Sequence, residues 1–113
     1  MNNYRFNATV VRWVDGDTVE LIVDLPFYLT YRNHFRLLGV DTPERGRAGY
    51  AEATAYCNAW APPGTRVTAT TEKDDKYGRW LVHLADDDSK SINDLLLASG
   101  HAYSYNGGTK SAH

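Results

Sequence analysis

Two aspartates, Asp17 and Asp41, are the residues of this 113-residue chain whose type and spacing most clearly suggest chemistry. If the strands beside them form a hairpin that turns within 26–30, the two side chains face each other at its open end. Opposed residues of an antiparallel pair lie about 4.5–5.5 Å apart, and carboxylates that close repel unless one is protonated or a cation lies between them. Carboxylate oxygens suit Ca²⁺ or Mg²⁺. The alternative is that both are turn residues at strand ends, where Asp is favoured.

Two arginines could bring positive charge to the same place. Arg36 lies in an otherwise apolar strand, and a half-buried arginine needs an anionic partner, either a local carboxylate or a substrate phosphate. Regular alternation puts Arg36 and Asp41 on opposite faces, so a bulge or bend near Gly39 is needed to bring them together. Arg79 ends the run DKYGR at 75–79, which could bind phosphate or form a solvated turn.

The elements that must position these residues are short strands and two helices. Segments 4–14 and 18–25 are rich in β-branched and aromatic residues and are joined by Asp15-Gly16, a hairpin signal. The remaining elements are expected as a strand at 31–40, a helix at 48–61, strands at 65–72 and 80–85, and a helix at 92–99. This order, β-β-β-α-β-β-α, favours a small closed barrel over two layers.

The composition fits one small domain. Hydrophobic residues make up 42% of the chain, and no run is long enough to span a membrane. The net charge of −2 argues against nucleic-acid binding by bulk electrostatics, so phosphate chemistry must rest on a few placed cations. The single cysteine, Cys57, excludes an intramolecular disulfide and is expected to be buried in the first helix. The three tryptophans are expected to pack in the core or at the barrel rim.

Three motifs, in this order, resemble the staphylococcal nuclease (thermonuclease) family. They are DGDT at 15–18, FRLLGVDTPE at 35–44 and DKYGR at 75–79. Each motif is weak alone, but their order and separations are specific, and the similarity runs from about Val10 to about Tyr105. The resemblance implies a mainly β fold with two helices, built on a five-stranded oligonucleotide/oligosaccharide-binding (OB) barrel. That fold agrees with the element order above.

The resemblance also implies a metal site. Asp17 and Asp41 resemble the carboxylate ligands of a catalytic Ca²⁺, one per chain, and Thr42 resembles a ligand through its backbone carbonyl. Mg²⁺ or Mn²⁺ are possible substitutes.

Further roles follow from the same resemblance. Glu44 matches the carboxylate that orients or deprotonates the attacking water, and Arg36 and Arg79 match the cations on the scissile phosphate. Four more residues are implied near the substrate: Lys76, Tyr77, Tyr103 and Tyr105.

The chain departs from the family pattern in three features: a slightly acidic net charge, a loop and the C-terminal end. Only RGRAG, residues 45–49, separates Glu44 from the expected helix, so the loop here is short. The chain ends soon after Tyr105, so we expect a domain over 1–105 that lacks the family's C-terminal helix, followed by a flexible tail over 106–113.

These observations favour a calcium-dependent, largely sequence-non-specific nuclease that acts on DNA or RNA and leaves 3′-phosphate ends. The alternative is a weak or inactive barrel of the same shape that binds nucleic acid or a protein without cutting. The presence of both arginines and all three carboxylates favours the enzyme. We expect no membrane association, a monomer with a dimer as the alternative, and a cytoplasmic location unless a leader has been removed.

Overall fold

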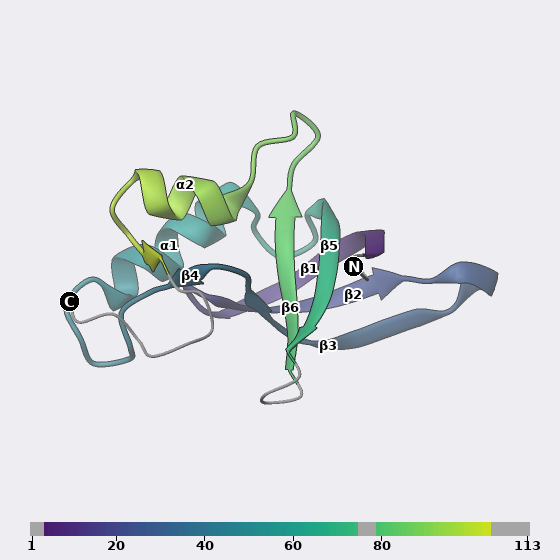
Figure 1. The fold of residues 1–113 in the computed structure, drawn as a ribbon, viewed down its shortest axis with the longest axis horizontal. Coiled ribbons are helices and arrows are strands. Elements are labelled where there is room, and N and C mark those ends of the chain that lie inside the picture. Colours follow the sequence, from purple (N-terminus) through teal and green to yellow (C-terminus); the bar gives the residue numbers. More distant parts are fainter. Residues whose placement is uncertain (1–3, 75–78, 105–113) are drawn as a thin grey trace.

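Five strands close into a barrel in the order β1-β2-β3-β6-β5 (Figure 1). The computed structural model describes residues 4–74 and 79–104. The barrel strands are β1 (Tyr4–Asp15), β2 (Thr18–Asp24), β3 (Thr30–Leu37), β5 (Arg66–Asp74) and β6 (Arg79–Ala85). Neighbouring strands are antiparallel except β3 and β6, which pair in parallel. The predicted five-stranded barrel is therefore confirmed.

Two helices and a small second sheet lie together at one end of the barrel (Figure 1). Helix α1 spans Tyr50–Trp60 and packs on β1, and helix α2 spans Ile92–Ala98 and packs on β6. Strands β4 (Val40–Asp41) and β7 (Tyr103–Ser104) form the small sheet. No helix in the described ranges is long and apolar enough to cross a membrane.

Alternate side chains of each strand fill the barrel, because successive side chains of a strand point to opposite faces of the sheet. The largest fully buried side chains include Leu21, Leu37, Leu84 and Leu96, which come from four different elements. Cys57, on the inner face of α1, is also fully buried, which confirms its expected place. Trp13 is buried, and Trp60 and Trp80 pack partly buried against the core.

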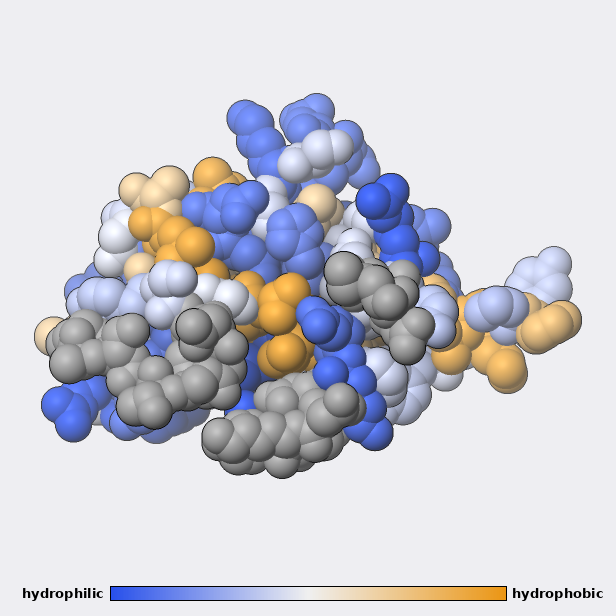
Figure 2. Space-filling view, viewed as in Figure 1, coloured by the Kyte–Doolittle hydropathy of each residue, from blue (hydrophilic) through white to orange (hydrophobic). Residues whose placement is uncertain are grey.

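The β2–β3 hairpin extends beyond the barrel as a two-stranded ribbon (Figure 1). Its tip contains a 3₁₀ turn, η1 (Pro26–Tyr28), and exposes apolar side chains, which Figure 2 shows at the outer end of the ribbon. Thr18 pairs with Arg36 and Asp24 with Thr30. The hairpin is thus centred two residues earlier than the sequence suggested. The backbone N–H of Leu37 donates to the carbonyl of Asp17 (2.8 Å), so the expectation that Asp17 opposes Asp41 is wrong.

A turn at Leu38–Gly39 divides the expected strand 31–40 into β3 and β4. Gly39 has a φ of +79°, in the left-handed region that glycine enters at little cost. The expected continuous strand is wrong, because after Leu37 the chain leaves β3 to pair with β7. The expected bend near Gly39 is confirmed, and it sets the direction of Asp41.

Candidate active site

Arg36 lies between Asp17 and Asp41. Its Nη2 is 3.1 Å from Oδ1 of Asp41 and 3.6 Å from Oδ2 of Asp17, and its Nη1 donates to the carbonyl of Val40 (2.8 Å). The exposed fractions of these side chains are only 12% for Arg36, 15% for Asp17 and 5% for Asp41. Of the two kinds of partner expected for Arg36, this structure shows the local carboxylates. The mutual repulsion of the two carboxylates is offset by the guanidinium between them.

Two turns, distant in the sequence, bring the aspartates together. Asp17 lies in the β1–β2 turn, and Asp41 follows the turn at Leu38–Gly39. The backbone N–H of Thr42 donates to Oδ2 of Asp17 (3.2 Å), which ties the two turns directly. The two aspartates therefore converge by the bend after β3 and not by the hairpin register.

Gly16 allows this close approach. A Cβ built on Gly16 would lie 2.9 Å from Cβ of Ala53 in α1 and 3.0 Å from Oγ1 of Thr42, so a side chain does not fit. The Cys57 thiol donates to the carbonyl of Gly16 (3.3 Å). Burial, with a smaller contribution from the charge of Asp17, raises the pKa of Cys57 to about 12. The thiol is therefore protonated at neutral pH and is no nucleophile.

The short loop after Glu44 is anchored to the β1–β2 turn. The backbone N–H of Arg47 donates to the carbonyl of Glu44 (2.9 Å), while the Glu44 side chain is exposed. The Tyr50 hydroxyl donates to Oδ1 of Asp15 (2.8 Å), and this hydrogen bond raises the pKa of Tyr50. Arg45 lies 3.8 Å from the same carboxylate and stacks over the Tyr50 ring. Glu44 is thus held on a tethered loop three residues after Asp41.

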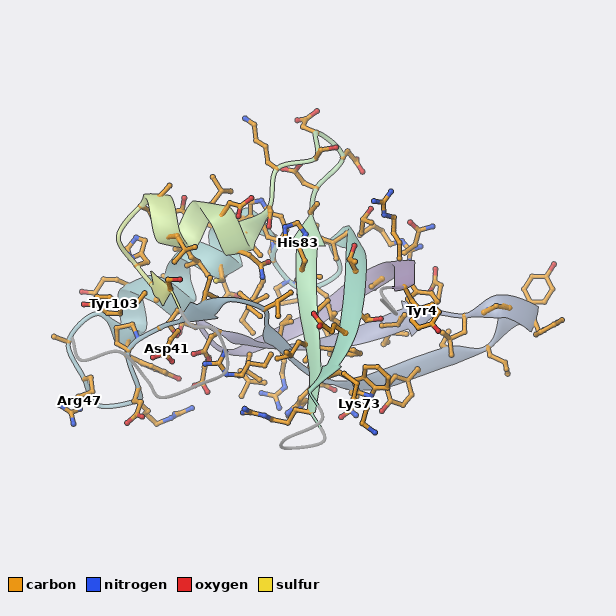
Figure 3. All side chains as sticks on the ribbon, viewed as in Figure 1. Tyr4, Asp41, Arg47, Lys73, His83 and Tyr103 are labelled. Atoms are coloured by element: carbon orange, nitrogen blue, oxygen red, sulfur yellow. The ribbon has the colours of Figure 1, made fainter. Side chains whose placement is uncertain are left out.

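The remaining predicted residues lie around this centre. Arg79 is exposed at the start of β6 and lines a groove with Arg36. Tyr103 pairs with Asp41 across β4 and β7, and Figure 3 shows the two labelled residues close together. Lys76, Tyr77 and Tyr105 fall outside the described residues.

Comparison with known proteins shows the family to which this chain belongs. A model of the family described as staphylococcal nuclease homologue matches residues 34–113, more than half of the chain. This protein belongs to the staphylococcal nuclease family. An "Uncharacterized endonuclease" of Escherichia coli O157:H7 is 29% identical over 99 residues, which cover 88% of this chain and 61% of the relative. Endonuclease YncB of Bacillus subtilis strain 168 is 32% identical over 115 residues, covering 92% and 52% respectively. The chain therefore spans about half to three-fifths of the length of these relatives.

In this staphylococcal nuclease homologue, Asn93 is a supporting residue that the sequence analysis missed. Its Nδ2 donates to the carbonyls of Leu38 (2.8 Å) and Val82 (3.1 Å), and its Oδ1 accepts from the N–H of Leu84 (3.1 Å). Its own N–H is capped by the Ser91 hydroxyl (3.1 Å). Asn93 thus connects α2, β6 and the Leu38–Gly39 turn. The sequence predicts only the cap by Ser91. The backbone groups that the Asn93 side chain contacts, in Leu38, Val82 and Leu84, belong to distant segments.

The oxygen atoms of this site provide some of the ligands that a hard divalent cation needs. Asp17 and Asp41 supply carboxylate oxygens at one buried point, as Ca²⁺ and Mg²⁺ prefer. Within residues 4–74 and 79–104, no group of three or more His, Cys, Asp or Glu side chains could hold a metal. The Thr42 hydroxyl is buried near Gly16 and makes no hydrogen bond in the described part. The backbone carbonyl of Thr42 stays the ligand that the family resemblance implies. Ca²⁺ takes six to eight oxygens, so water and substrate would have to complete the set.

Proposed function

We propose that this protein is a calcium-dependent nuclease that hydrolyses phosphodiester bonds of DNA or RNA. The observation that carries the proposal is the convergence of Asp17, Asp41 and Arg36 at one buried point beside an open groove. Family membership and two endonuclease relatives support it. The substrate, the ion and the 3′-phosphate products are part of the proposal.

In this proposal Asp17, Asp41 and the Thr42 carbonyl hold Ca²⁺. When bound, the ion supplies positive charge that stabilises charge developing on the phosphate. Mg²⁺ or Mn²⁺ could replace Ca²⁺ with lower activity, because a smaller ion demands a more regular oxygen cage than two carboxylates provide.

The chain's own residues supply the remaining chemistry. Arg36 and Arg79 bind the scissile phosphate and stabilise its added negative charge in the transition state. Glu44 accepts a proton from the attacking water, whose oxygen forms the new bond to phosphorus. The bond from phosphorus to the 5′ oxygen breaks, and that oxygen leaves as a hydroxyl after it gains a proton from water. The products are a 3′-phosphate and a 5′-hydroxyl end.

Digestion of plasmid and single-stranded DNA with Ca²⁺, with Mg²⁺ and with a chelator tests this function. We expect cleavage with Ca²⁺ and none with chelator. Glu44→Gln and Arg79→Ala should each lower the rate roughly 10²-fold or more, the scale of a lost charge-stabilising group. Arg66→Ala, an exposed arginine paired with Asp24 on the barrel, is the matched control and should cleave normally. Unchanged rates in both site variants would overturn the roles, and binding without cleavage would support the inactive module.

A further inference from the structure

The strands β3 and β6 diverge beside the candidate site. They pair only from Phe35 and Trp80 onward, while β3 from Thr30 to His34 pairs with β2 alone. The divergence leaves a groove of about 570 Å³, which we name the fork groove. Its lining includes aromatic and cationic side chains: Tyr31, Phe35, Arg36, Lys73, Arg79 and Trp80.

One end of the fork groove is cationic. Arg36 and Arg79 line it there, which links the groove to the proposed phosphate site. The Nζ of Lys73 lies 5.8 Å from the centre of the Trp80 ring, so a third cation lies over this aromatic side chain. Positive charge and an aromatic surface thus occur together on a chain whose net charge is −2.

The other end of the groove is aromatic. Tyr31 and Phe35 pack edge to face with ring centres 6.3 Å apart, and the Tyr31 hydroxyl accepts a hydrogen bond from Asn33 (2.6 Å). Both rings, with Trp80, also line an adjoining apolar chamber of about 300 Å³. Tyr4 and Phe6 complete its aromatic wall. The groove therefore places two arginines beside the exposed ring of Tyr31 and the partly exposed ring of Trp80, while Phe35 is almost fully buried.

The fork groove and Tyr103 lie on different sides of the proposed reaction centre. In the view of Figure 3, Asp41 lies between Tyr103 on one side and Lys73 on the other. Tyr103 pairs with Asp41 in the small sheet, whereas Lys73 pairs with Trp80 in the barrel. A nucleic-acid strand that passes the arginines would thus meet aromatic side chains on both sides of the cut.

We infer that the fork groove is a nucleobase subsite, which holds one unpaired base against Trp80 and Tyr31 beside the scissile phosphate. The inference rests on the proposed function, because Arg36 and Arg79 connect the two. Stacking on aromatic rings accepts every base, since each has a π face, and a base inside a duplex cannot reach the rings without being unstacked. Trp80 therefore packs on the core and also serves substrate.

Binding of a labelled single-stranded DNA of about six nucleotides, measured in chelator so that no cleavage occurs, tests the subsite. Trp80→Ala should weaken binding about tenfold, and Trp80→Phe, which keeps an aromatic ring, only slightly. Tyr31→Ala gives an independent reading should Trp80→Ala fail to fold. Tyr28→Ala is the control, because Tyr28 is fully exposed at the ribbon tip outside the groove.

A double-mutant cycle separates stacking from a structural effect. A series of oligonucleotides carries an abasic site at each position in turn. At one position the missing base should weaken binding to the wild-type protein about as much as Trp80→Ala does. The same oligonucleotide should bind Trp80→Ala only slightly more weakly than the intact one does. Unchanged binding by Trp80→Ala, or additive effects at every position, would overturn the subsite. If the protein cleaves DNA normally but the two changes weaken binding additively, the subsite is wrong and the nuclease proposal stands. If the two changes are coupled but the protein cleaves no DNA under any condition, the subsite stands and the nuclease proposal is wrong.

Discussion

Arg36 carries the positive charge that offsets the repulsion between Asp41, which is buried, and Asp17, which is partly buried. Its guanidinium reaches both carboxylates, at 3.1 and 3.6 Å, and neither carboxylate is well exposed. A divalent cation held by the same carboxylates, as proposed, would therefore compete with Arg36. The residue proposed to bind phosphate would then also oppose metal binding, and measurement can separate the two roles.

Arg36→Met tests this competition. With the guanidinium removed, the affinity of metal-free protein for Ca²⁺ should rise about tenfold or more, because two carboxylates lose their neutralising partner. Cleavage should still fall, since the phosphate loses a cation. Isothermal titration calorimetry gives the affinity. Arg66→Met changes the net charge equally at an exposed pair and should leave the affinity near wild type. Unchanged or weaker Ca²⁺ binding by Arg36→Met would contradict the competition.

At the scale of elements, α2 is too short to be stable alone, and its attachment through Asn93 fixes the turn that directs Asp41. Isolated helices need about 12–15 residues to be even marginally stable, and α2 has 7. Asn93 supplies hydrogen bonds to Leu38, Val82 and Leu84 in addition to the packing of Leu96. The geometry of the site thus depends on a helix that contributes no residue to it.

Asn93→Asp should lower the free energy of unfolding by about 2–3 kcal/mol, because it removes two buried donors and faces carbonyl oxygens with a carboxylate. Urea denaturation measures the loss. Activity under conditions where the variant is folded should also fall, since the Leu38 carbonyl is released. Asn58→Asp, on α1 with one hydrogen bond to the carbonyl of Thr54, is the matched control. A loss for Asn93→Asp no larger than that of the control would show that the network does not hold the turn.

At the scale of the whole molecule, one ion cluster connects three barrel strands. Glu20 on β2 is 8% exposed and accepts from Nε of Arg12 on β1 (2.9 Å) and Nε of Arg32 on β3 (2.6 Å). His34 lies 3.7 Å away. The hydrogen bond from Arg32, with that from Arg12, lowers the pKa of Glu20 against the opposing effect of burial.

This lowered pKa predicts a pH dependence of stability. The charged carboxylate contributes stability above its usual pKa of 4.5, and that contribution is lost as the pH falls through the lowered value. The melting temperature of Glu20→Gln should therefore lie below wild type near neutral pH, and the difference should shrink in acid. Thermal unfolding between about pH 7 and pH 3 measures it. Glu72→Gln, an exposed glutamate on β5, should show a much smaller difference. A difference for Glu20→Gln that stays constant with pH would exclude the mechanism.

Much of the architecture is readable from local sequence. Alternating apolar residues predict the strands, Asp15-Gly16 predicts the first turn, and the small and aromatic residues of 48–61 predict α1, which begins two residues later and ends one earlier. The motifs identify the family and place Asp17, Arg36 and Asp41 in one site. These features depend on residues a few positions apart, whose backbone preferences act before any tertiary contact forms.

Tertiary structure decided how those residues meet. The register of β2 and β3 differs from the expected one because the turn at Pro26–Tyr28 centres the hairpin two residues earlier. Asp41 reaches Asp17 through the turn at Leu38–Gly39. Hydrogen bonds from Leu38 to Val82 and Asn93, which lie far along the chain, hold that turn. The fork groove likewise exists only because β6 joins β3 along part of its length. Contacts between distant segments are set by shape and packing in the folded barrel, which no local pattern encodes.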